Sequence, residues 1–176
     1  MHEWCLKSLL LGKRLLRVTD NKADRPSPVP PLLTFLAGGG TVQEIRKMER
    51  DQLDTMYRVA FMRFNSGRFE DSLKIFRYLC LLDHTSYSYF LGFGLSQYEL
   101  SQFASAAATF SHTEKLNDKD PRASLMMAKS FVKIKQWHLA RDALSEAVRR
   151  ASQSAEWGGE LKQAKALISF VDDKLQ

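Results

Sequence analysis

The side chains best able to do chemistry in this chain are its histidines and cysteines. The histidines are His2, His84, His112 and His138, and the cysteines are Cys5 and Cys80. No two histidines lie three or four residues apart, the spacing that places two ligands on one helix face, so the sequence predicts no metal site. Cys80 sits in an apolar stretch and is expected in the core. His84 follows a helical pattern, where a histidine favours the helix C-terminus electrostatically, and we do not expect a general base.

A glycine triplet at residues 38–40 is the next candidate, because glycine-rich loops can bind phosphate groups. Such a loop follows a strand and ends in Gly-Lys-Ser or Gly-Lys-Thr, whereas Thr41 follows the triplet directly. Thr41 and Glu44 instead have the spacing of a helix capping box. The Gly-x-Ser-x-Gly motif of serine hydrolases is also absent. The sequence therefore predicts no catalytic residue, no cofactor and no enzyme activity.

The elements that position the other residues recur every 34 residues. Four columns of similar side chains share this step: Ala60, Gly94 and Ala128; Ser72, Ala106 and Ala140; Phe69, Phe103 and Trp137; Phe76, Phe110 and Leu144. Small residues suit close helix crossings, an aromatic ring covers each bend, and the fourth column fills the gap between neighbouring repeats. This period is that of the tetratricopeptide repeat (TPR). We predict an all-α fold of three tandem TPR helical hairpins in a short superhelix, with repeats at about 53–86, 87–120 and 121–154.

The flanks of the repeats are expected to differ from each other. Residues 1–31 contain a basic, apolar start and four prolines within 26–31, which favour an extended chain, so we predict a flexible N-terminal extension. A signal peptide is the alternative for residues 1–18, although no small-x-small cleavage site follows. The single TPR domain is expected at 32–176, with a helical N-terminal segment and, after Gly158-Gly159, a capping helix at about 160–175.

Composition excludes several classes of protein. The chain has 176 residues and a net charge of +6, but its bases do not gather on one face, so no nucleic-acid partner is predicted. Steep salt dependence would mark the alternative, a nucleic-acid or membrane-surface binder that uses the basic N-terminal residues. No apolar run approaches 18 residues, so no stable membrane insertion is expected.

A peptide-binding groove is the function that the pattern favours, because the first helix of each repeat lines the concave face of a TPR stack. The groove residues predicted from the repeat register are Tyr57, Phe61, Phe64, Leu91, Leu95, Tyr98, Leu125, Lys129 and Val132. The first of these helices is apolar on two sides, and an apolar face is buried by something. That covering is either a bound peptide or the flanking helices. A general TPR adaptor for another peptide is the alternative function.

Several stretches together resemble the LcrH/SycD-type chaperones, the class II chaperones of bacterial type III secretion. They are FLAGGGT at 35–41, LDTMYRVAFMRFNSGRFEDSLKIFRYLCLLDH at 53–84, FLGFGLSQY at 90–98 and DPRAS at 120–124. The resemblance spans residues 32–150. The sequence departs from the family in its basic pI of about 9.4 and in residues 1–24, which have no recognised counterpart.

This resemblance implies a chaperone of the bacterial cytoplasm for the pair of hydrophobic translocator proteins that form a pore in the host membrane. It implies that their N-terminal segment, of the form Pro-x-Leu-x-x-Pro, lies extended in the groove. It also implies a possible homodimer formed through the helical region at about 32–50. The residues predicted for that contact are Leu32, Leu33, Phe35 and Leu36.

Overall fold

The computed structural model describes residues 38–42, 44 and 49–176, and these residues form helices and turns without a strand. The elements are α4 (Arg50–Asn65), α5 (Phe69–Leu82), α6 (Tyr87–Glu99), α7 (Phe103–Leu116), α8 (Arg122–Lys133), α9 (Trp137–Ala151), the 3-10 helix η1 (Ala155–Trp157) and α10 (Gly158–Leu175). This arrangement confirms the predicted all-α class. The expected N-terminal extension and the dimerisation residues lie outside the described residues.

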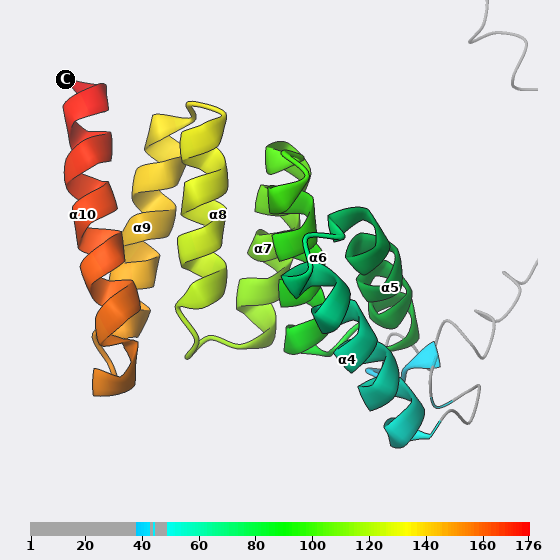
Figure 1. The fold of residues 1–176 in the computed structure, drawn as a ribbon. Helices are drawn as coiled ribbons and strands as arrows, with labels where there is room; N and C mark the ends of the chain where they lie inside the picture. The colour runs from blue at the N-terminus through cyan, green and yellow to red at the C-terminus, as the bar shows by residue number, and fades with distance from the viewer. Residues whose placement is uncertain (1–37, 43, 45–48) are drawn as a thin grey trace, which may run out of the picture. The chain divides into compact units, whose positions relative to one another are not determined.

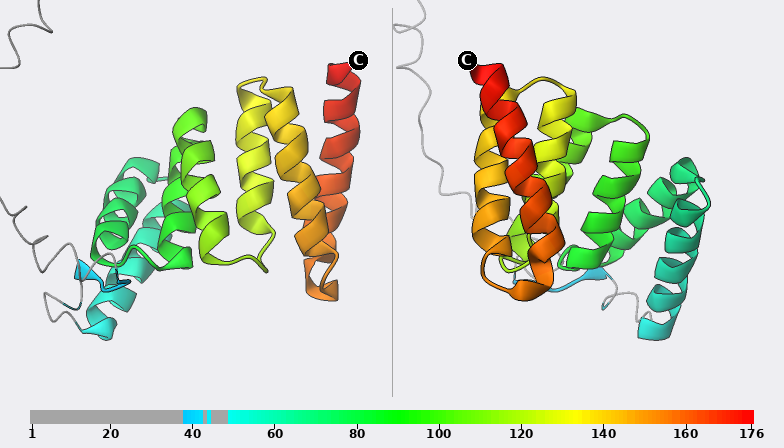
Figure 2. Two further views of the ribbon diagram at one scale, coloured as in Figure 1. Left: turned by 180° about the vertical axis from the view of Figure 1, so that it is seen from behind. Right: turned by 60° about the vertical axis from the view of Figure 1, so that its left-hand side comes forward.

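The helices pair in chain order into three hairpins, α4 with α5, α6 with α7, and α8 with α9 (Figure 1). Each helix packs mainly on the next one along the chain, and α10 packs on α9 (Figure 2). Further contacts join α4 to α6, α6 to α8, and α8 to α10. The first helices of successive hairpins are therefore neighbours in space, as expected for stacked TPR units.

The turn inside each hairpin has the same backbone geometry in all three repeats. Gly67, Ser101 and Lys135 each take a positive φ, of 75°, 59° and 59°. In the first turn the N–H of Gly67 donates to Phe64 O at 3.0 Å, and the next N–H reaches Arg63 O at 2.9 Å. These two bonds form a Schellman motif, which satisfies carbonyl groups at the end of the helix. The 34-residue period is thus present in the turns as well as in the side chains.

Burial of the repeated columns confirms the interpretation of the pattern. Ala60, Ala106, Phe110 and Leu144 are fully buried, and Phe76 is nearly so. A Cβ atom added to Gly94 would lie 2.6 Å from Cε1 of Phe110, so only glycine permits this close approach of α6 and α7. One of the column members, Phe76, also contacts the backbone of Gly92 in the next hairpin, where a Cβ would overlap its ring.

Capped turns lie on both sides of the three hairpins. The N–H of Thr41 donates to Glu44 Oε2 at 3.1 Å, and the N–H of Glu44 donates to Thr41 Oγ1 at 3.4 Å, which confirms the capping box. After the third hairpin, Ser154 Oγ accepts from the N–H of Glu156 at 3.4 Å and caps η1. The capping helix expected at about 160–175 is α10, which begins two residues earlier, at Gly158. Exposed glycines are tolerated in a first helical turn, where little packing depends on them.

The capping helix α10 packs on α9 as its apolar spacing predicted. Ala164 and Val171 are fully buried, and Leu167 and Ile168 are half-buried against the same core. Beside this contact, the carboxylate of Asp172 pairs with Nε of Arg141 at 2.6 Å. An ion pair at the edge of the contact thus accompanies the apolar packing.

Candidate functional site

The helix α4 has two faces that differ sharply in exposure. Ala60 is fully buried, whereas the adjacent Phe61 is 51% exposed. A helix turns about 100° per residue, so the two side chains point in different directions. The Phe61 ring lies parallel to that of Tyr57, with 6.4 Å between centroids and 14° between planes. Phe61 is therefore a surface aromatic supported from one side and open on the other.

Tyr57 links this surface ring to the core. Its ring meets Phe76 edge-on at 5.8 Å and lies 5.9 Å from the ring of Tyr89 on α6. Contacts of this kind add to burial by restricting the orientation of each ring. Phe64, one turn further along α4, packs edge-on against Phe69 at 5.3 Å. The predicted aromatic residues Tyr57 and Phe64 are thus held in place by ring contacts with α5 and α6.

The helix α6 supplies the aliphatic part of the predicted site. Leu91, Leu95 and Tyr98 are half-buried and pack on the core formed by the second and third hairpins. Tyr98 meets Phe103 edge-on at 5.3 Å, which repeats the contact between Phe64 and Phe69 one hairpin earlier. These side chains keep part of their surface available for a partner.

The helix α8 departs from the prediction at one position. Leu125 is only 3% exposed and belongs to the core, so it has little surface to offer a peptide. Lys129 and Val132 are half-buried. Burial lowers the pKa of Lys129, and the negative charge of Glu160 on α10 acts in the opposite direction. We refer to the remaining set as the α4–α6–α8 face: Tyr57, Phe61, Phe64, Leu91, Leu95, Tyr98, Lys129 and Val132.

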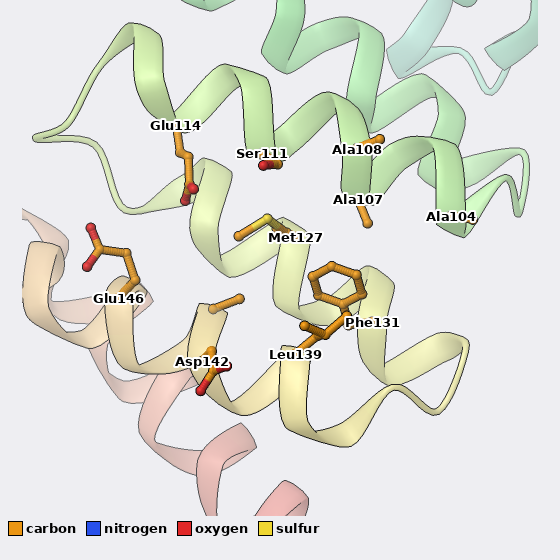
Figure 3. Close-up of a pocket in the computed structure, with 11 residues that line it drawn as sticks. Ala104, Ala107, Ala108, Ser111, Glu114, Met127, Phe131, Leu139, Asp142 and Glu146 are labelled. Atoms are coloured by element: carbon orange, nitrogen blue, oxygen red, sulfur yellow. The ribbon is translucent and has the colours of Figure 1, made fainter. Parts of the chain in front are cut away.

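The opposite side of α8 borders a hollow that the sequence analysis did not predict (Figure 3). The hollow has a volume of about 540 Å³ and lies between α7 and α9, with Met127 and Phe131 of α8 among its lining residues. Met127 and Phe131 are each two residues from Lys129, about 200° around the helix, so Lys129 points away from the hollow. The alanines of α7 could have indicated this hollow in the sequence, since Ala104, Ala107 and Ala108 all line it.

Carboxylates lie at one end of this hollow, but two of them are already engaged. Glu146 accepts hydrogen bonds from Nε of Arg149 at 2.7 Å and from Nε of Arg150 at 2.6 Å. The bond from Arg149, followed by that from Arg150, lowers the pKa of Glu146 to about 2. Glu114 accepts from Ser124 Oγ at 2.9 Å. The carboxylates of Glu146 and Glu114 are therefore already bonded to other side chains of the protein.

Other residues singled out in the sequence have structural surroundings. Cys80 is buried, and burial together with the charge of Asp83 raises the pKa of its thiol to about 12, as expected for an unreactive core cysteine. His112 packs edge-on against Phe90 at 4.5 Å. Within the described part of the chain, no group of three or more His, Cys, Asp or Glu residues is arranged to hold a metal ion. None of the helices described there is both long and apolar enough to cross a bilayer.

Comparison with known proteins first identifies similar folds. Residues 65–147 match the family model of "Anaphase-promoting complex, cyclosome, subunit 3". The fold is similar to a chain in the crystal structure of a type III secretion system (T3SS) complex from Aeromonas hydrophila, with a TM-score of 0.81 and 26% identity over 83% of this chain and 97% of that one. The Yersinia enterocolitica type III secretion translocator chaperone SycD is also similar, with a TM-score of 0.70 and 26% identity over 75% of this chain and 98% of SycD.

Sequence comparison then gives particular relatives. The chain is 36% identical over 89 residues to the low calcium response locus protein H of Yersinia pestis, which is 51% of this chain and 53% of that protein. It thus spans about half the length of the curated relatives it matches. SycD in complex with a peptide of the translocator YopD is a further similar structure. It has 25% identity and a TM-score of 0.70 over 73% of this chain and 98% of that one. The resemblance to LcrH/SycD-type chaperones is therefore confirmed in both sequence and fold.

Proposed function

We propose that this protein is a type III secretion chaperone that binds the N-terminal segment of hydrophobic translocator proteins on the α4–α6–α8 face. Binding would keep the translocators soluble and apart before secretion. The observation that carries the proposal is the exposure of Phe61 beside the buried Ala60, in a row of apolar side chains on three neighbouring helices. The similarity to SycD, which has been solved with a translocator peptide, supports the same function.

In this proposal the protein works in the bacterial cytoplasm, and it acts by binding rather than by catalysis. A hydrophobic translocator exposes apolar segments before it reaches a membrane, and such segments aggregate unless another apolar surface covers them. The partially exposed rings of α4 and the half-buried leucines of α6 supply a surface of that chemistry. Extended peptides bound on such faces depend on a few anchor side chains for most of their affinity.

The test of this proposal is a pair of substitutions that separate binding from folding. Phe61→Ala is expected to leave thermal unfolding nearly unchanged and to weaken binding of a fluorescein-labelled peptide of the form Pro-x-Leu-x-x-Pro. Loss of an aromatic anchor costs about 2 kcal/mol, or roughly thirtyfold in affinity. Phe76→Ala is the matched control, because this ring is 1% exposed and its truncation should cost about 3–5 kcal/mol of folding stability. Unfolding caused by Phe61→Ala, with intact binding per folded molecule, would refute the site.

We also propose that two copies of the chain pair through Leu32, Leu33, Phe35 and Leu36, which lie outside the described residues. A solved SycD structure is described as an alternative dimer, which supports self-association in this class of protein. Changing both Leu33 and Leu36 to Glu places two charges in the predicted contact, and buried unpaired charges are strongly unfavourable. The variant should sediment as a monomer where the unaltered protein sediments as a dimer. An unchanged dimer would place the interface elsewhere.

A further inference from the structure

The α4–α6–α8 face changes in chemistry along the stack at one repeat position. Phe61, Leu95 and Lys129 are separated by steps of 34 residues and occupy the same register on α4, α6 and α8. The side chain is aromatic on the first helix, aliphatic on the second and cationic on the third. A segment that crosses the three helices would therefore meet two apolar contacts and then an ammonium group.

Lys129 has no partner of its own in the described part of the chain. No hydrogen bond or ion pair joins its amine to any described residue. Arg122, the first residue of α8, is already engaged, because its guanidinium pairs with Asp120 at 2.6 Å. Glu160 on α10 acts on both cations electrostatically but forms no ion pair with either. Among these charges, the Lys129 ammonium is the cation left without a direct contact.

Because Lys129 is partly buried, the absence of a bonding partner for its amine is unfavourable in free energy. Lys129 is half-buried, and burial lowers its pKa because the charged amine has lost part of its water shell. A carboxylate brought to the amine would replace the lost water with a charge-assisted hydrogen bond. The competing explanation is that the lysine stem only lies along apolar surface with its head in water. The two explanations predict different peptide preferences.

We propose that the segment bound on the α4–α6–α8 face carries an Asp or Glu whose carboxylate meets Lys129, which makes Lys129 a specificity-determining residue. This inference rests on the proposed function. Packed helices lie about 8–10 Å apart, and an extended chain advances about 3.3 Å per residue. The step from one helix to the next is therefore about three residues. The acidic residue should lie about six residues from the one that covers Phe61.

The experiment uses the full chain and three fluorescein-labelled peptides with amidated C-termini. The first is Pro-Ala-Leu-Ala-Ala-Pro-Ala-Ala-Asp, which places Asp six residues after Leu. The second carries the Asp at the opposite end, before the first Pro with three alanines between, so that it lies six residues before Leu and tests the opposite direction of the bound segment. The third replaces the Asp of the first with Asn. Fluorescence anisotropy gives the ratio of affinities for the Asp and Asn peptides.

The unaltered protein is expected to bind one of the two Asp peptides about five- to tenfold more tightly than the Asn peptide. Lys129→Met keeps the length of the side chain and should bring this ratio to about one, whereas Lys129→Arg should retain it. Glu160→Gln should increase the ratio by removing the competing negative charge. Lys165→Met is the matched control, since it removes the same charge from an exposed position on α10 and should leave the ratio unchanged.

The outcomes separate this inference from the function on which it rests. If peptides bind but neither Asp peptide is favoured, or if Lys129→Met leaves the ratio intact, the carboxylate contact is wrong and the chaperone proposal stands. If no peptide binds to the unaltered protein, the proposed function fails and this inference fails with it. Thermal unfolding of each variant checks that an altered ratio comes from a folded protein.

Discussion

The turn inside each hairpin requires one residue in the left-handed region of backbone conformation. Gly67 occupies that position in the first repeat, whereas Ser101 and Lys135 occupy it in the second and third. A side chain with a Cβ atom is disfavoured there by roughly 1–2 kcal/mol relative to glycine. Nothing lies within 4 Å of a Cβ built on Gly67, so the backbone alone sets this preference. Two of the three turns therefore carry a local strain that the first avoids.

Ser101→Gly is expected to stabilise the fold by relieving this strain. Ser101 is exposed, so the change removes no packing. Glycine gives the unfolded chain more conformational freedom, which offsets part of the gain, so the net stabilisation should be about 0.5–1 kcal/mol. That gain corresponds to a rise of roughly 1–4 °C in Tm. Gly67→Ser is the reverse control and should lower Tm by a similar amount. A lower Tm for Ser101→Gly would mean that its side chain contributes more than the backbone strain costs.

Single residues of the candidate site were predictable only where the repeat register decides their direction. The register correctly separated Phe61 from Ala60, because adjacent residues on a helix point about 100° apart. The register was wrong about Leu125. It places Leu125 in the same position as Tyr57 and Leu91, which are half-buried, but Leu125 itself is buried. How deeply a position is covered depends on the neighbouring helix, and the register does not contain that information.

At the scale of helices, one arginine connects the ends of two second helices. Arg150 on α9 is 6% exposed, and its Nη1 donates to the carbonyl oxygens of Glu114 and Asn117, each at 3.1 Å. These carbonyl groups lie at the end of α7, where a helix leaves its last acceptors without internal partners. Glu146 Oε1 accepts from Nε of the same guanidinium at 2.6 Å. Arg150 therefore acts as the C-terminal cap of a helix in the preceding repeat.

Arg150→Ala should destabilise the fold by about 3 kcal/mol, because it leaves two part-buried carbonyl groups without donors and removes a nearly buried guanidinium that pairs with Glu146. Arg149→Ala is the matched control, since Arg149 also bonds to Glu146 but is exposed. It should cost much less, because water screens an exposed ion pair. Urea-induced unfolding followed by circular dichroism measures both. Equal losses would show that the carbonyl contacts of Arg150 contribute little.

The arrangement of helices was largely predictable, because the 34-residue period fixes helix order, turn position and the small residues at crossings. Two features were not. The 3-10 helix η1, whose first turn Ser154 caps, was not predicted, although the capping helix after it was placed within two residues. The hollow between α7 and α9 arises from how far apart these helices lie, and the alanines of α7 indicate small side chains without indicating that spacing.

At the scale of the whole stack, α10 closes one end of the described core. No repeat can bury its apolar face alone, so the last hairpin needs a cover with a polar outer side. Val171 and Ala164 are fully buried on this contact, Phe170 packs edge-on against Trp137 at 6.2 Å, and Asp172 pairs with Arg141 at 2.6 Å. The outer residues of α10, such as Lys165 and Asp173, are exposed. The helix thus has the two faces that a terminal cap requires.

Removal of α10, by ending the chain after Ser154, should lower Tm and produce self-associated species, because the apolar side of α9 loses its cover. Val171→Asp in the full chain tests the same contact without deletion, since a buried unpaired charge is as disruptive as the missing helix. Lys165→Asp changes charge on the exposed side and should leave Tm and mass unchanged. Sedimentation velocity and thermal unfolding measure these outcomes. A truncated chain that stays monodisperse with an unaltered Tm would show that the three hairpins are stable without α10.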